Sequence, residues 1–185
     1  MRAHVTGWLL ALASCSAPVL ETLEPPPGRP AALPRYNAAG ELLRPEGHED
    51  WVFVGSSIGL GYSEGSRQDG PGNLQNVFME PASFAEYERS GRFPEKTMLA
   101  LVLHESRQRE SIARQGYFSG ELVALEMAVK DSERFPEGWS YFSFGKDRAA
   151  AAAKPRGECY PCHLEHGTDN VFVQFYPRLR NRPAD

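Results

Sequence analysis

The sequence lacks several features that would point to particular classes of protein. It has no run rich in Lys or Arg and a formal net charge of -4, so a nucleic-acid partner is not expected. The glycines of residues 59–72 lack phosphate-loop spacing, which argues against a nucleotide site. No internal repeat or heptad pattern is present. With 41% hydrophobic residues in a chain of 185, one globular domain with its own core is expected.

The longest apolar run near the N-terminus, residues 5–13, is too short to span a bilayer, which needs about 20 residues. It follows a positively charged start, so residues 1–14 are predicted to be a signal peptide. Residues 12–15, Leu-Ala-Ser-Cys, resemble the bacterial lipobox, in which the mature chain begins at a lipidated cysteine. We therefore expect a protein on the periplasmic side of a bacterial envelope, in the outer membrane, attached only by a lipid on Cys15. The alternative is an ordinary signal peptide that leaves Cys15 as a free thiol.

Residues 15–44 are rich in Pro, Gly and Ala. Proline fixes φ and removes a hydrogen-bond donor, so this composition favours extended, solvated chain. The sequence therefore predicts a tether over residues 15–44 and a folded domain over residues 45–185.

The other two cysteines form a C-x-x-C-H motif, Cys159-Tyr160-Pro161-Cys162-His163. Two thiols at this spacing can add to the two vinyl groups of one haem, and the adjacent histidine can bind its iron. The motif predicts a single covalent haem c on Cys159 and Cys162, with His163 as an axial ligand. A zinc-binding turn is a poorer interpretation, since a closed zinc site needs four protein ligands and no second such pair is present. A Cys159–Cys162 disulfide is the other alternative.

The order of apolar and turn-forming segments predicts a β-rich α+β fold, a mainly antiparallel sheet of about five strands with a few short helices. Residues 118–130 also have helix-forming composition. Strands are predicted at residues 51–54, 73–79, 97–104, 118–130, 139–144 and 170–176, a helix at 82–89, and a helical turn at 149–153.

Several segments in this order resemble the family of cytochrome P-460 and cytochrome c′-beta, over residues 51–179. The resemblance implies an antiparallel sheet packed around a haem, a homodimer formed through the sheets, and a strand at residues 118–130. It is carried by Asn-Val-Phe-Met-Glu-Pro at 76–81, Phe-Pro-Glu-Lys at 93–96, Val-Lys-Asp-Ser-Glu-Arg-Phe at 129–135 with Gly138-Trp139, the C-x-x-C-H motif, and Val-Phe-Val-Gln-Phe-Tyr-Pro at 171–177.

Two behaviours are known in this family. The P-460 type joins a lysine to the haem and oxidises hydroxylamine, whereas the c′-beta type has an apolar distal face that binds nitric oxide and other small gases. The lysine position of the P-460 type corresponds to Leu101, which cannot form the link. The resemblance therefore favours a gas-binding cytochrome with a distal pocket built from Leu101, Leu99, Phe78 and Glu126.

Two other functions remain open at this point. A surviving cross-link, or Glu126 acting as a proton donor, would make the protein a hydroxylamine or nitric oxide oxidoreductase. A methionine as sixth iron ligand would make it an electron carrier, and Met98, Met79 and Met127 are the candidates. The alternation of residues 98–103 places Met98 out of phase with Leu101. The sequence identifies no electron-transfer partner.

Overall fold

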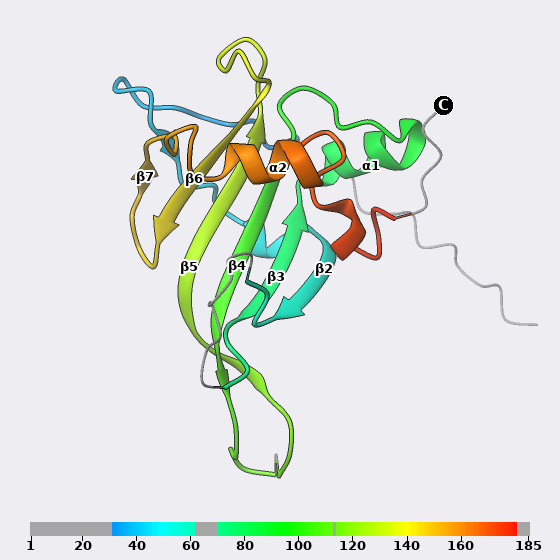
Figure 1. Cartoon of the computed structure of the whole chain (residues 1–185). Coiled ribbons are helices and arrows are strands. Elements are labelled where there is room, and N and C mark those ends of the chain that lie inside the picture. The colour runs from blue at the N-terminus through cyan, green and yellow to red at the C-terminus, as the bar shows by residue number, and fades with distance from the viewer. Residues whose placement is uncertain (1–30, 62–69, 113, 181–185) are drawn as a thin grey trace, which may run out of the picture.

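The computed structural model describes residues 31–61, 70–112 and 114–180 (Figure 1). The predicted signal peptide, Cys15 and residues 15–30 of the predicted tether lie outside the described residues. No helix within the described ranges is long and apolar enough to cross a membrane.

A five-stranded antiparallel sheet forms the centre of the molecule (Figure 1). Consecutive strands are neighbours throughout, so each connection is a hairpin or a short excursion. The predicted β-rich α+β fold is confirmed. The strands, in sheet order, are β2 (Val52–Ile58), β3 (Leu74–Met79), β4 (Met98–Arg107), β5 (Phe118–Lys130) and β6 (Trp139–Gly145).

The ambiguous segment β5 is a strand, as the family resemblance implied. Its side chains alternate, with Leu125, Met127 and Val129 fully buried on one face and Glu126 and Ala128 half-buried on the other. Two neighbouring strands supply the backbone partners of β5. Sheet pairing therefore outweighs the helix propensity of its Leu, Ala, Glu and Met residues.

In the part of the chain that the structure describes, two α-helices accompany the sheet, α1 (Pro81–Ser90) and α2 (Tyr160–His166). The start of α1 is capped by the carboxylate of Glu80, which accepts a hydrogen bond from the backbone N–H of Ser83 at 2.8 Å. It ends at Gly91, whose φ of 70° is the left-handed conformation typical of a helix C-terminus. The predicted helix at 82–89 is confirmed. The described residues also include the 3₁₀ helices η1 (His48–Asp50) and η2 (Val173–Phe175).

One face of the sheet, which we call the closed face, is covered by the N-terminal part of the described chain. Strand β1 (Leu42–Leu43) pairs there with β7 (Ala150–Ala151), and Leu42 is completely buried against this face. The folded body thus includes residues on the N-terminal side of Pro45. The prediction of a helical turn at 149–153 is wrong, because the pairing of β7 with β1 holds this short alanine segment extended.

The opposite face, which we call the site face, is covered by the C-terminal part of the chain, including α2 (Figure 1). The predicted strand at 170–176 is wrong. Val171 and Phe172 are buried there, and the chain then turns into η2. This segment packs on the face of the sheet and does not extend its edge, so its β-prone side chains are buried without a strand ladder.

Candidate functional site

Helix α2 carries the C-x-x-C-H motif. Cys159 is its N-cap, and Cys162 and His163 follow three and four residues later. Residues at these spacings lie on the same side of a helix, so both thiols and the imidazole project from one side of α2. Both cysteines are free thiols and half-buried. The motif is thus compact in space as well as in sequence.

The imidazole of His163 lies between two aromatic rings. Its centroid is 4.2 Å from that of Tyr141 and 4.1 Å from that of Phe172. Burial lowers the pKa of His163 below its usual range, while its backbone hydrogen bond opposes the shift. The two rings cover the faces of the imidazole and leave its edge for bonding. The neutral form that can bind a metal is therefore favoured.

The backbone carbonyl of Asn170 fixes the tautomer of His163. Its oxygen is 2.8 Å from Nδ1 of His163 and 3.2 Å from the hydroxyl of Tyr141. A carbonyl only accepts hydrogen bonds, so Nδ1 must carry the proton and Nε2 must carry the lone pair. Metal-binding histidines in proteins commonly have this arrangement, in which the second ring nitrogen donates to a carbonyl.

A tight turn at residues 168–171 presents this carbonyl. Thr168 and Val171 exchange backbone hydrogen bonds of 2.9 and 3.1 Å, and the two residues between them have positive φ, 46° for Asp169 and 59° for Asn170. Positive φ at both central positions is the requirement of a type I′ turn, and Asp and Asn tolerate it better than most residues. Such conformations cost of order 1–3 kcal/mol each and persist where surrounding contacts hold them.

A cavity of about 150 Å³ adjoins the motif, between the site face and the C-terminal segment. Its wall on the sheet is apolar and is formed by Val77, Leu99, Leu101 and Ala128. Cys159 and His163 line the same cavity. The structure therefore brings Leu101 and Leu99 together with one of the thiols and the predicted iron ligand.

Two charged residues also line the cavity, Glu126 and Lys154. Glu126 is the cross-strand partner of Leu101. Burial raises its pKa above the usual carboxyl range, and the charge of Lys154 and a hydrogen bond with Ser143 partly oppose this shift. The ammonium of Lys154 is 3.1 Å from the carboxylate of Glu158, outside the cavity wall. The cavity is thus mainly apolar, with one carboxyl group and one lysine in its lining.

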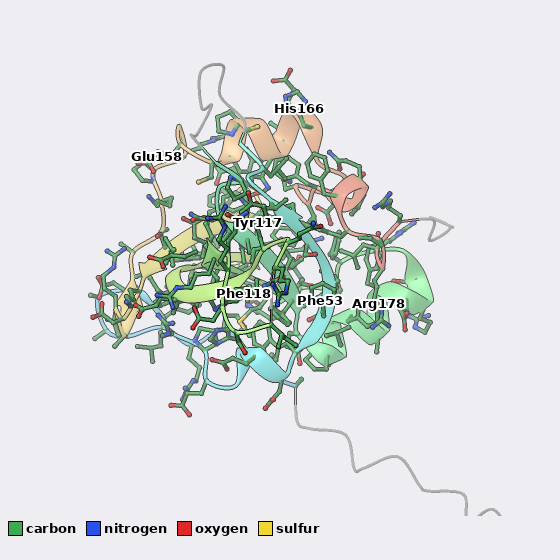
Figure 2. All side chains as sticks on the ribbon, turned by 90° about the horizontal axis from the view of Figure 1, so that it is seen from below. Phe53, Tyr117, Phe118, Glu158, His166 and Arg178 are labelled. Atoms are coloured by element: carbon green, nitrogen blue, oxygen red, sulfur yellow. The ribbon has the colours of Figure 1, made fainter. Side chains whose placement is uncertain are left out.

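Most of the other predicted site residues lie away from the cavity. Phe78 and Met98 pack into the core of the closed face. Met127 belongs to the same core but also lines the cavity. Met79 is on the site face, where it is fully buried in the core. His166, which follows His163 on α2, is exposed and points outward (Figure 2).

The lysines near the predicted cross-link position are held in ion pairs. Lys96 contacts the carboxylates of Asp131 at 2.5 Å and Glu133 at 2.7 Å. Lys130 contacts Asp169 at 2.7 Å. Position 101 itself, on the cavity wall, is leucine.

Comparison with known proteins assigns the chain to a family. A family model described as cytochrome P460 matches residues 45–173, more than half of the chain. This chain belongs to the cytochrome P460 family. The resemblance seen in the sequence is confirmed at the level of the family, and membership implies a c-type haem cytochrome. No curated protein matches the chain.

The donor groups at the site fit a haem c. Cys159 and Cys162 would carry the macrocycle through thioether bonds, and Nε2 of His163 would bind its iron. The apolar cavity wall suits a porphyrin face. Within the described residues no cluster of three or more His, Cys, Asp or Glu side chains could hold a bare metal ion.

Sequence reasoning missed Tyr141, Asn170 and Lys154. Tyr141 lies in a predicted strand, but only the fold shows that its ring faces His163. The Asp-Asn pair at 169–170 is a turn signal that was available in the sequence. The apolar residues that follow this pair are β-prone, so local composition favours a strand there.

Proposed function

We propose that this protein is an exported mono-haem c-type cytochrome that binds small uncharged gases, nitric oxide above all, at an apolar face of its haem. The observation that carries the proposal is the arrangement of His163. Its Nδ1 is held by the Asn170 carbonyl, and it shares a cavity with the apolar side chains of Leu99 and Leu101. Bound haem would supply the iron on which a diatomic ligand is held.

The character of the cavity wall supports a preference for nitric oxide. Haem pockets stabilise bound oxygen through hydrogen-bond donors, and the polarity of the pocket decides which ligands are favoured. Leu99, Leu101, Val77 and Ala128 provide no donor, so a ligand that needs little hydrogen bonding is favoured beside these four side chains. The lining also contains Lys154, whose ammonium pairs with Glu158, and Glu126. Leu101 also cannot form an amine link to the macrocycle.

An optical titration tests this proposal directly. We expect the purified, reduced holoprotein to change its Soret band when nitric oxide is added. A six-coordinate low-spin reduced spectrum that is unchanged by the gas would contradict the proposal and support a His/Met electron carrier. A strongly red-shifted Soret band would support a lysine cross-link.

Covalent attachment has its own test. The double variant Cys159→Ala/Cys162→Ala should lose covalent haem, measured by haem staining after denaturing electrophoresis. His166→Ala is the matched control, because its side chain is exposed and it should keep the haem. Haem that stays covalently bound in the double variant would contradict attachment at the motif.

Glu126 supports a second candidate, an oxidoreductase that acts on hydroxylamine or nitric oxide. The residue lines the cavity, and burial raises its pKa, so it can hold a proton close to a bound ligand. Glu126→Gln should abolish hydroxylamine oxidation if this function is correct, while nitric oxide still binds. If wild type shows no turnover with an excess of an artificial electron acceptor, the second candidate is excluded.

Export and anchoring are proposed from residues 1–15. Labelling with a palmitate analogue should modify wild type and not Cys15→Ala. The same variant, expressed with its own leader, should leave the membrane fraction. Equal labelling of both proteins would contradict the lipid anchor.

A homodimer through the sheet is proposed from the apolar side chains exposed near the β2 edge. Phe53 and Ile58 are 45% and 44% exposed, and the ring of Phe53 lies 5.7 Å from that of Phe78. Light scattering should give twice the monomer mass for wild type and the monomer mass for Phe53→Lys. Leu164→Lys, at an exposed apolar residue of α2, is the control that should remain dimeric.

A further inference from the structure

The carboxylate of Asp169 is held by two neighbouring strands at once. Its Oδ2 is 2.7 Å from Nζ of Lys130, and its Oδ1 accepts a hydrogen bond of 3.0 Å from Nε1 of Trp139. Lys130 ends β5, Trp139 begins β6, and the two are direct cross-strand partners. Both carboxylate oxygens are therefore fixed to one end of the β5–β6 hairpin.

The two donors are themselves held in place. Trp139 is 2% exposed, and its ring packs edge-on against Phe93 at 5.8 Å. Nζ of Lys130 also donates to the backbone carbonyl of Phe93 at 2.9 Å. The end of the hairpin is thus a rigid support for Asp169.

Asp169 and Asn170 are the two central residues of the tight turn at 168–171. Because backbone hydrogen bonds between Thr168 and Val171 close that turn, the carboxylate of Asp169 and the carbonyl of Asn170 belong to one small rigid unit. The carbonyl is 2.8 Å from Nδ1 of His163. Fixing the carboxylate therefore fixes the position of the carbonyl.

We propose that Asp169, Lys130 and Trp139 are positioning residues for the iron ligand. Through the turn they hold the Asn170 carbonyl on the Nδ1 proton of His163, and so they set the strength of the bond between His163 and the iron. This inference rests on the proposed ligation of iron by His163. Lys130, whose ammonium pairs with the carboxylate of Asp169, thereby gains a function.

The expected effect follows from the chemistry of imidazole. A strong hydrogen bond from Nδ1–H increases the electron density of the ring and makes Nε2 a better donor. A better donor favours ferric over ferrous iron. Loosening the carbonyl should therefore weaken the iron–histidine bond and raise the reduction potential.

The test compares holoprotein variants that break this ion pair with one that breaks a similar pair elsewhere. Asp169→Asn and Lys130→Gln remove the charge pair at the turn. Lys96→Gln is the matched control, because the side chain of Lys96 also pairs with an aspartate, Asp131, and not with Asp169. Its backbone N–H donates to the carbonyl of Lys130, and the substitution leaves this hydrogen bond in place. All three are compared with wild type by resonance Raman spectroscopy of the ferrous form and by redox titration.

We expect the iron–histidine stretching frequency to fall and the potential to rise in Asp169→Asn and Lys130→Gln, with no change in Lys96→Gln. A tenfold loss of preference for ferric iron corresponds to a rise of about 59 mV for a one-electron couple. Equal values in wild type and both variants would overturn the inference, and so would an equal change in the control.

The result separates this inference from the proposed function. If wild type shows no iron–histidine stretch, ligation by His163 fails and the inference fails with it. If wild type shows the stretch and the variants do not move it, only the inference fails. Should Asp169→Asn not assemble with haem, Trp139→Phe carries the same test, because it removes the other donor to the carboxylate while keeping an aromatic ring in the core.

Discussion

The two faces of the sheet are built from similar side chains but are closed by different parts of the chain. On the closed face, the N-terminal segment buries Leu42 against Leu125, Phe142 and Phe144, all at most 1% exposed. On the site face, the C-terminal segment packs against the sheet and leaves a cavity beside Leu99 and Leu101. One face is thus completed as a core, and the other keeps space next to chemically active groups.

This difference explains how one sheet can serve stability and binding together. Close packing on the closed face supplies buried apolar area, whereas the site face gives up some of that packing around His163. The segment that carries the motif also carries the turn that orients its histidine. Three comparisons between the two faces follow, and then one between a half-buried and an exposed glutamate of β5, in order of decreasing expected effect.

Leucine truncation should distinguish the faces most strongly. Leu125→Ala should lower the free energy of unfolding by about 2–5 kcal/mol, because it creates a cavity in a fully packed core. Leu101→Ala should cost less, since this half-buried side chain already borders a cavity. Urea denaturation of both variants measures the difference. An equal loss in the two would mean that the faces are packed alike.

A methyl group at Gly167 should disturb the site face specifically. A Cβ there would lie 2.5 Å from the carbonyl oxygen of His163 and 2.8 Å from the backbone nitrogen of Val171. Gly167→Ala should therefore cost about 1–3 kcal/mol and reduce haem incorporation. Gly157→Ala is the control, because nothing lies within 4 Å of its added Cβ. Unchanged melting temperature and haem content in Gly167→Ala would contradict the geometry.

Two tyrosine hydroxyls offer a milder comparison. Tyr141→Phe on the site face removes a hydrogen bond to the Asn170 carbonyl and should cost about 0.5–1.5 kcal/mol. Tyr36 packs near the closed face, and its buried hydroxyl has no hydrogen-bond partner among the described residues. Tyr36→Phe should therefore be neutral or stabilising. Thermal unfolding of both variants measures the two changes in stability. A larger loss of stability in Tyr36→Phe than in Tyr141→Phe would contradict this prediction.

The pH dependence of stability should differ in sign between two glutamates of β5. Burial raises the pKa of Glu126, so its contribution is present below the unfolded pKa of 4.5 and is lost as pH rises through the folded value. A hydrogen bond from Lys146 lowers the pKa of exposed Glu121, so its contribution is lost as pH falls. Glu126→Gln should gain stability relative to wild type as pH rises, and Glu121→Gln should lose it.

Urea unfolding at a series of pH values from 3 to 8 measures both effects (the range spans the usual carboxyl pKa by more than a unit on each side). Parallel curves for Glu126→Gln and wild type would show that Glu126 titrates as an ordinary exposed carboxyl. The half-buried Glu126 would then be no different from an exposed carboxyl on the same strand.

Much of the fold could be predicted from sequence patterns. The strands at 73–79, 97–104, 118–130 and 139–144 and the helix at 82–89 were placed correctly within a few residues. The segments at 149–153 and 170–176 were wrong. The first pairs with β1, which lies far away in the sequence, so its local composition did not determine its conformation. The second forms short-range backbone hydrogen bonds and packs on the face of the sheet, so its β-prone side chains are buried without a strand partner.

The candidate site was predicted only in part, and Phe78 shows why. It adjoins Val77, and either residue could have faced Leu101. In the sheet the cross-strand partner of Leu101 is Val77, which puts Phe78 on the closed face. A shift of one residue in register exchanges the two faces, and the register depends on partners and bulges such as that between Phe53 and Gly55.

The sequence by itself determined the chemistry of the haem motif, because the spacing of Cys159, Cys162 and His163 is a local property of the chain. It also determined that leucine occupies position 101. Only the tertiary structure decided what surrounds the histidine. The carbonyl of Asn170 and the ring of Phe172 reach His163 from the segment that follows α2, and the ring of Tyr141 reaches it from β6. The carboxylate of Asp169 is anchored to β5 and β6. These contacts arise from packing between elements, which the local pattern of the motif does not encode.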